Sequence, residues 1–218
     1  IGGAEKSLIT LLNQIESNSL YEIHLLMFVK GGELEKLLPR NIITHYVNIP
    51  KLNFIERVKY FLERRIFKKF RKKKLHNAQI YWVIISKKII KFNDYFDVAI
   101  AYNQGLSTYF VSKFISAKFK VAWVNADYLR VGYLMENDYI FYANFNRIVT
   151  VSESCTKSFA KLINCFNLKI PIDTYVPDGV DYKTIQKLAD EKLDVIFDTK
   201  KINIVTLGRL SKPKGQHI

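Results

Sequence analysis

Two patterns of apolar residues alternate along the chain. In one, apolar residues recur every three or four positions, as in amphipathic helices; in the other they form short runs, as in buried strands. The expected helices are residues 3–16, 52–75, 78–91, 153–163 and 182–193. The expected strands are residues 21–29, 42–47, 97–102, 119–124, 147–151, 173–176 and 202–207. This alternation predicts an α/β fold, with a Rossmann-like parallel sheet and helices on both of its faces.

A turn signal at Pro177-Asp178-Gly179 divides the chain into two unequal parts. Residues 1–178 are enough for one domain of ordinary size. Residues 179–218 hold one expected helix, one expected strand and a loop, which are too little to fold alone. We therefore expect a Rossmann-like domain over 1–178. Over 179–218 we expect the crossover and first elements of a second, truncated Rossmann-like domain.

The loops that follow the strands are the first candidates for chemistry, because ligands of parallel sheets bind beyond the carboxyl ends of the strands. Gly208, Arg209 and Lys214 follow the strand expected at 202–207. Glycine lets the backbone come close to a ligand, arginine offers a planar fork to phosphate oxygens, and lysine offers a point charge. This loop suits an anionic ligand; a solvated basic loop is the alternative.

Two further segments suit a polar ligand. Gly2 and Gly3 open the first expected helix, and a helix N-terminus can hold an anion or a hydroxyl group. Asn125 and Asp127 follow the strand expected at 119–124 and could recognise substrate hydroxyls or stabilise charge near a reacting sugar. The alternative for this pair is a helix N-cap or an Asx turn, which suits both residue types.

The sequence shows no pattern typical of a metal site. Its four histidines are scattered, and Asp94 and Asp97 do not form an Asp-x-Asp pair, so we expect neither a metal nor a cofactor. Cys155 and Cys165 fall on one expected helix, where a rise of about 1.5 Å per residue keeps them too far apart for a disulfide. We expect two buried free thiols, as in a protein of the reducing cytoplasm.

Composition and charge indicate whether the chain folds and what kind of partner it binds. Hydrophobic residues make up 49% of the chain and its net charge is +14, which argues against disorder and favours an anionic partner. The segment from Arg57 to Lys74 concentrates ten Lys and Arg residues and a single acid. This pattern predicts a basic amphipathic helix, which suits an anionic membrane surface. The alternative is a solvated helix whose apolar stripe packs on the domain. The stripe consists of Ile55, Val58, Leu62, Ile66 and Phe70.

Four segments, taken in order, resemble family 4 of the glycosyltransferases, also called glycosyl transferases group 1. Residues 2–5 (GGAE) look like the GGxE turn after the first strand of that family. Residues 148–152 (IVTVS) look like a late strand of its N-terminal domain. Residues 176–181 (VPDGVD) resemble its crossover segment, and residues 205–210 (VTLGRL) with Lys214-Gly215 resemble the segment that opens its C-terminal domain.

The resemblance implies a retaining glycosyltransferase of the GT-B type, with two Rossmann-like domains facing a cleft and no required metal. A sugar would pass from a nucleotide-diphosphate sugar to a glycan or lipid-linked acceptor of the cell envelope. The protein would be cytoplasmic, or peripheral on the inner face of the membrane. The chain would supply the acceptor-side domain, with the strand before Gly2 and the paired glutamates of the donor site missing, so we expect it to be inactive alone.

The resemblance also assigns roles to residues. Arg209 and Lys214 match the pair that contacts the donor diphosphate, and with Asp127 they are the candidate catalytic residues. Candidates for substrate binding are Gly2, Gly3, Asn125, Asp178, Gly179 and Gly208. Two positions depart from the family pattern: Asn125 stands where a histidine is frequent, and Asp178 replaces an asparagine of the crossover.

Two other functions remain open on the sequence. The net charge of +14 would suit a basic nucleic-acid-binding module, but no helix-turn-helix, RNP or zinc signature is present, so we expect no specific nucleic-acid partner. A nucleotide-sugar epimerase of the GT-B fold would keep the donor chemistry and lack the acceptor.

Overall fold

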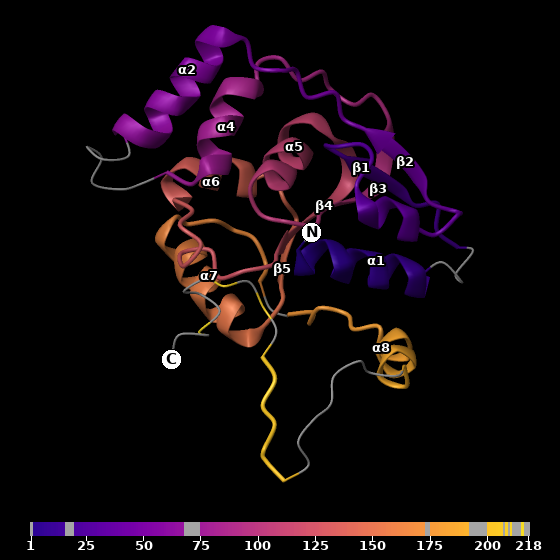
Figure 1. The fold of residues 1–218 in the computed structure, drawn as a ribbon. Helices are drawn as coiled ribbons and strands as arrows, with labels where there is room; N and C mark the ends of the chain where they lie inside the picture. Colours follow the sequence, from indigo (N-terminus) through magenta and orange to yellow (C-terminus); the bar gives the residue numbers. More distant parts are fainter. Residues whose placement is uncertain are drawn as a thin grey trace. The chain divides into compact units, whose positions relative to one another are not determined.

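The computed structural model describes residues 2–15, 20–67, 75–172, 175–191, 200–206, 208, 210 and 215 (Figure 1). The chain divides into two compact units, Ile1–Val180 and Asp181–Ile218. Within the described part of the first unit, helices alternate with parallel strands. The α/β class expected from the sequence is therefore confirmed.

The strands of the first unit form two small parallel sheets instead of the single sheet that we expected. One sheet pairs β1 (His24–Met27) with β2 (Ile43–Tyr46). The other has the order β3-β4-β5, from β3 (Tyr95–Ala101), β4 (Ser116–Val124) and β5 (Arg147–Thr150). Each of these strands lies within or overlaps an expected one.

The helices of the first unit partly follow the expectation. The structure contains α1 (Gly3–Ile15), η1 (Glu33–Leu37), α2 (Phe54–Leu62), η2 (Glu63–Phe67), α4 (Asn77–Ile85), α5 (Leu106–Phe114), α6 (Met135–Tyr142) and α7 (Glu153–Cys165). The long helix expected over 52–75 is present as α2 and the π-helical turn η2, and residues 68–74 lie outside the described part of the chain. The sequence patterns did not predict α5 or α6. Both cysteines are free as expected, but Cys165 is exposed and not buried.

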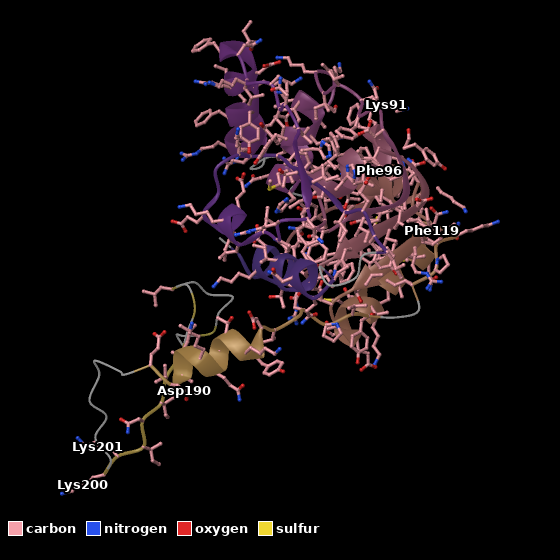
Figure 2. All side chains as sticks on the ribbon, turned by 90° about the vertical axis from the view of Figure 1, so that its right-hand side faces the viewer. Lys91, Phe96, Phe119, Asp190, Lys200 and Lys201 are labelled. Atoms are coloured by element: carbon pink, nitrogen blue, oxygen red, sulfur yellow. The ribbon has the colours of Figure 1, made fainter. Side chains whose placement is uncertain are left out.

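One face of the three-stranded sheet carries the core of the first unit. Ala101, Ala122 and Ile148 of the sheet pack with Tyr142 of α6 and Phe159 of α7. A second cluster joins α4 to α5 around Trp82, Tyr109 and Phe114. The other face of the sheet is much less covered. Its residues Val98, Ile100 and Phe119 are exposed, and Phe119 projects at the surface of the domain (Figure 2).

A cavity of about 270 Å³ interrupts the sheet between β1 and β3. Its lining is mostly apolar and includes Leu8 of α1, Leu25 and Leu26 of β1, and Val98 and Ile100 of β3. Because the cavity separates β1 from β3, the facing edges of these two strands do not pair in the described structure. This gap is the physical reason for two sheets where one was expected.

A buried carboxylate ties α6 to its neighbours. Asp138 of α6 accepts hydrogen bonds from Gln79 Nε2 at 2.9 Å, from the Tyr109 hydroxyl at 2.8–2.9 Å and from the Tyr128 hydroxyl. Burial raises the pKa of Asp138 to about 6, although these hydrogen bonds act in the opposite direction. The network joins α4, α5, the loop after β4 and α6 through one side chain.

The second unit contains α8 (Tyr182–Ala189), whose N-cap Asp181 accepts a hydrogen bond from the Thr184 amide at 3.1 Å. The prediction of a strand at 202–207 is wrong for its described part, because residues 202–206 are exposed and belong to no strand. A strand needs hydrogen-bonding neighbours, and the described part of this unit offers none. In the first unit, residues 175 and 176 are the described part of the strand expected at 173–176, and Tyr175 forms a parallel bridge with Thr150.

Candidate functional site

The carboxyl ends of β3 and β4 bring two aromatic residues together. Ala101 of β3 is in register with Ala122 of β4, so Tyr102 and Trp123 are neighbours at this edge of the sheet. Their ring centroids are 4.9 Å apart, with the planes tilted by 33°. Asn125 directly follows β4 at the same edge. The edge therefore carries two aromatic rings and an amide.

Asn125 is held in place by the loop that follows β3. Its backbone amide donates to the buried Gln104 Oε1 at 3.0 Å, and its side-chain Nδ2 donates to the Tyr102 carbonyl oxygen at 2.7 Å. These two hydrogen bonds connect the loops after β3 and β4 and fix the orientation of the amide. Asn125 was a candidate from the sequence, whereas Tyr102 and Gln104 were not. The signal that could have found them is their position at the end of the strand expected at 97–102, which Tyr102 closes and Gln104 follows by two residues.

Two buried polar atoms at this edge lack a hydrogen-bond partner among the described residues: the Trp123 Nε1 donor and the Asn125 Oδ1 acceptor. Buried polar groups without a partner are rare in proteins, and each such group calls for a ligand, a water or a functional explanation. A hydroxyl group both donates and accepts hydrogen bonds. The chemistry of the edge therefore suits a ligand that carries hydroxyl groups and has an apolar face to lie against the two rings.

The N-terminal half of α1 meets the same edge. The Ser7 hydroxyl of α1 lies 3.0 Å from the Tyr102 hydroxyl, which anchors the helix over the end of β3. The first turn begins with Gly2 and Gly3, and a Cβ atom added to Gly3 would meet nothing within 4 Å. The backbone amides of a first helical turn have no partner within the helix. The negative charge of Glu5 in this turn would repel an anion bound at the helix N-terminus. A neutral ligand with hydroxyl groups therefore fits this position better than an anion does.

Asp178 and Gly179, at the end of the first unit, lie near α1 and Tyr102. A Cβ atom added to Gly179 would stand 3.3 Å from Thr10 Cγ2 of α1, so the backbone of the segment runs close to the helix. Burial raises the pKa of the Tyr102 phenol, the hydrogen bond with Ser7 lowers it, and the nearby Asp178 carboxylate raises it further. Of the residues selected from the sequence, Asn125 bonds to Tyr102, Asp178 acts on the Tyr102 phenol, and Gly179 lies close to α1, the helix that begins at Gly3.

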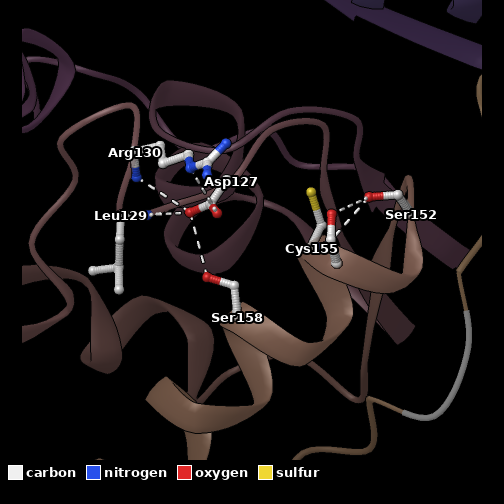
Figure 3. A network of polar contacts seen from close by, with 7 residues as sticks. Asp127, Leu129, Arg130, Ser152, Cys155 and Ser158 are labelled. Atoms are coloured by element: carbon white, nitrogen blue, oxygen red, sulfur yellow. Dashed lines mark hydrogen bonds and ion pairs between the residues drawn. The ribbon is translucent and has the colours of Figure 1, made fainter.

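Asp127 is engaged in a turn (Figure 3). Its Oδ1 accepts hydrogen bonds from the Leu129 amide at 3.1 Å, the Arg130 amide at 3.2 Å and the Ser158 hydroxyl at 3.3 Å. Its Oδ2 lies 3.9 Å from Arg130 Nε. An aspartate that accepts from the amides two and three residues ahead forms an Asx turn. This geometry favours the structural interpretation of Asp127 that the sequence left open.

The structure describes only one of the three residues expected to bind the nucleotide-sugar donor. Gly208 belongs to the second unit and is described, whereas Arg209 and Lys214 lie outside the described residues. Their assignment to the donor diphosphate stays a prediction.

Histidines offer a pair but not a cluster. His24 Nδ1 of β1 lies 2.9 Å from His45 Nε2 of β2, and His24 Nε2 lies 2.8 Å from a carboxylate oxygen of Glu22. No group of three or more His, Cys, Asp or Glu side chains suited to a metal ion occurs in the described parts of the chain. Nor is any described helix both long and apolar enough to cross a membrane.

Comparison with known proteins adds no assignment. No protein-family model matches the chain, and no curated protein sequence matches it. The features of this chain that bear on a function are therefore the chemistry of the carboxyl edge and the four family-like sequence segments.

Proposed function

We propose that the chain is the acceptor-side half of a retaining glycosyltransferase of the GT-B type, which transfers a sugar from a nucleotide-diphosphate sugar to a glycan or lipid-linked acceptor. The observation that carries the proposal is the pair of buried, unsatisfied atoms, Trp123 Nε1 and Asn125 Oδ1, beside the Tyr102 ring. A donor, an acceptor and aromatic faces at one edge of a parallel sheet are what a sugar needs for recognition. The four family-like segments add the reaction class.

In this proposal the carboxyl edge orients the acceptor. Both atoms are buried, so the loops after β3 and β4 must open before one acceptor hydroxyl donates to Asn125 Oδ1 and another accepts from Trp123 Nε1. The Tyr102 ring then covers an apolar face of the sugar. Arg209 and Lys214 stabilise the charge on the nucleotide diphosphate as its bond to the sugar breaks. The electron pair of that bond stays with the diphosphate, and the acceptor oxygen forms the new bond on the face of the sugar from which the diphosphate leaves. The proton of the acceptor hydroxyl passes to an oxygen of the departing diphosphate.

The gap between β1 and β3 also supports the proposal. Resemblance to the family predicts a strand directly before Gly2, and α1 leads from that point to β1. Parallel strands joined by a helix connect with right-handed geometry, so the predicted strand would run parallel to β1 beside it. The apolar gap between β1 and β3 lies where such a strand would complete a single sheet.

The gap leads to a prediction about the full-length gene product. If a strand precedes Gly2 there, amide hydrogens at the facing edges of β1 and β3 should exchange on the order of tenfold more slowly than in the 218-residue chain, because they gain hydrogen-bond partners. Hydrogen exchange measured by NMR tests this. Amides of β4, which already pairs with β3 and β5, serve as the control. Equal exchange at β1 and β3 in both proteins would contradict the proposed strand.

A second prediction tests the acceptor site itself. Asn125→Ala in the full-length gene product should reduce kcat/KM for the acceptor by about tenfold, the scale of one lost hydrogen bond to a substrate. The KM of the nucleotide sugar should stay the same. Because the variant also loses the bond to the Tyr102 carbonyl, its thermal midpoint must be measured in parallel.

The matched control is Asn93→Ala, which removes an exposed asparagine before the start of β3, at the opposite edge of the sheet. We expect wild-type kinetics from it. An Asn125→Ala variant that is as stable as the wild type and transfers sugar at the wild-type rate would rule out this residue as an acceptor contact.

A further inference from the structure

The helix α2 turns its apolar side chains away from the domain. Phe54, Ile55, Val58 and Phe61 are 79%, 76%, 41% and 54% exposed. At 100° per residue, these four positions occupy one continuous face of the helix. The helix therefore presents a continuous apolar surface, here called the α2 face and defined by these four residues.

Polar and aromatic contacts hold the other side of α2 and the following turn to the rest of the unit, where α2 lies beside α4 (Figure 1). Tyr60 contacts Tyr81 of α4 edge-to-face, with ring centroids 5.8 Å apart. Glu56 Oε1 lies 2.5 Å from Lys88 Nζ, and Arg64 Nε of η2 donates to Asn77 Oδ1 at 3.1 Å. The polar side of α2 thus faces the domain. In an ordinary amphipathic helix on a protein surface, that side would face the solvent.

For the described residues, this arrangement contradicts the alternative in which the apolar stripe of the helix packs on the domain. Of that stripe, Ile55 and Val58 are exposed and Leu62 is partly buried. The side chains of Ile66 and Phe70 lie outside the described residues. The physical reason is that α4 presents Tyr81 and Asn77 to α2 and η2, and the residues that fit them lie on the opposite side of α2.

Cations border the α2 face. On the helical wheel, Arg57 stands at one margin of the face and Lys59 at the other, and both are exposed. The guanidinium of Arg65 lies 5.6 Å from the centroid of the Phe61 ring. Glu56 is paired with Lys88, which lowers the pKa of this carboxyl, so its charge is compensated on the inner side. The exposed side of α2 therefore combines an apolar centre with cationic margins.

We propose that the α2 face inserts into the surface of an anionic membrane, with the axis of α2 in the plane of the bilayer. An interfacial helix binds by burying its apolar face at the boundary of headgroups and acyl chains, while flanking Lys and Arg residues contact anionic lipids. The net charge of +14 supplies the complementary attraction. The six cations between Lys68 and Lys74 follow the helix in sequence and add to it.

Charge complementarity selects this occupant over others. Nucleic acid would engage the cations but would leave the apolar centre in water. A second copy would bring two cationic margins together, and like charges repel. A lipid surface satisfies the apolar centre and the cationic margins at once. The proposal does not depend on sugar transfer, although a lipid-linked acceptor would be reached from this position.

Vesicle binding tests the proposal with the 218-residue chain as it exists. The probes are vesicles of phosphatidylcholine alone and of phosphatidylcholine with phosphatidylglycerol in equal parts. The wild-type chain should sediment with the anionic vesicles and far less with the neutral ones. Ile55→Ser/Phe61→Ser should weaken binding to anionic vesicles by on the order of tenfold or more, since it removes apolar side chains without changing charge.

The matched control is Tyr139→Ser/Ile140→Ser, which removes two exposed apolar side chains from α6 and should bind as the wild type does. Circular dichroism establishes that both variants are folded. Equal binding of neutral and anionic vesicles, or full binding by Ile55→Ser/Phe61→Ser, would overturn the proposal. So would a wild-type dimer that dissociates in this variant, because a second copy would then occupy the face. In the full-length gene product, the same two substitutions should leave transfer to a soluble acceptor unaffected, which separates this test from the proposed function.

Discussion

Asp138→Ala should lower the free energy of unfolding by about 3 kcal/mol or more at pH 7, because it leaves three buried donors without their acceptor. Gln79 Nε2 and the hydroxyls of Tyr109 and Tyr128 all donate to this carboxylate, and all three side chains are buried. Urea unfolding followed by circular dichroism measures the effect. A loss below about 1 kcal/mol, the scale of a surface substitution, would show that the network does not hold α6 in place.

The same carboxyl should give stability a characteristic pH dependence. Burial raises the pKa of Asp138 from 3.8 to about 6, so the folded state retains a proton that the unfolded state has lost between these two values. The contribution is therefore fully favourable below about pH 4, and it falls by roughly 3 kcal/mol as the pH rises to about 6. Above about pH 6 it stays constant.

Asp138→Asn provides the matched comparison, because it keeps the shape and one acceptor oxygen and cannot ionise. The difference in unfolding free energy between wild type and Asp138→Asn should change by roughly 3 kcal/mol between pH 4 and pH 6.5, moving against the wild type as the pH rises. Using the difference removes the contributions of other carboxyls. A difference that does not vary with pH, or that moves in the opposite direction, would contradict the raised pKa.

Arg209→Ala and Lys214→Ala should each reduce turnover by about 10²-fold in the full-length gene product, the scale of losing one preorganised electrostatic contact. Negative charge develops on the diphosphate as the glycosidic bond breaks, so the loss should appear in kcat more than in the KM of the donor. Initial rates of nucleotide-diphosphate release measure it.

Lys212→Ala is the matched control for these two variants, because it removes a cation from the same loop at a position that the family resemblance does not assign. It should retain turnover close to the wild type. Wild-type rates in Arg209→Ala and Lys214→Ala would refute their assignment. Equal losses in all three variants would show that the loop acts through its overall charge.

Local periodicity predicted most elements of the first unit, because strands such as β4 and helices such as α7 carry patterns that do not depend on their partners. The helix α6 escaped detection because one of its buried positions is Asp138, which interrupts the apolar pattern. The pattern also identified which side chains share a face of α2, but the neighbours in α4 decide which way that face points. Pairing across the gap between β1 and β3 is likewise a tertiary property.

The candidate site was predictable to a similar extent. Position after a strand selected Asn125, and a glycine turn before a helix selected Gly2 and Gly3. Tyr102 and Gln104 were missed because their role depends on the register between β3 and β4, which the sequence does not specify. Asp127, two residues beyond Asn125, satisfies its own turn, and only the geometry separates the two.

Sugar transfer itself is the most direct test of the account. The full-length gene product is incubated with a panel of radiolabelled nucleotide-diphosphate sugars and with glycan and lipid-linked acceptors, and the products are separated and analysed by NMR. The account predicts release of the nucleotide diphosphate together with a glycoside that keeps the anomeric configuration of the donor. Free or epimerised sugar without any glycoside, or no consumption of any nucleotide sugar, would contradict it.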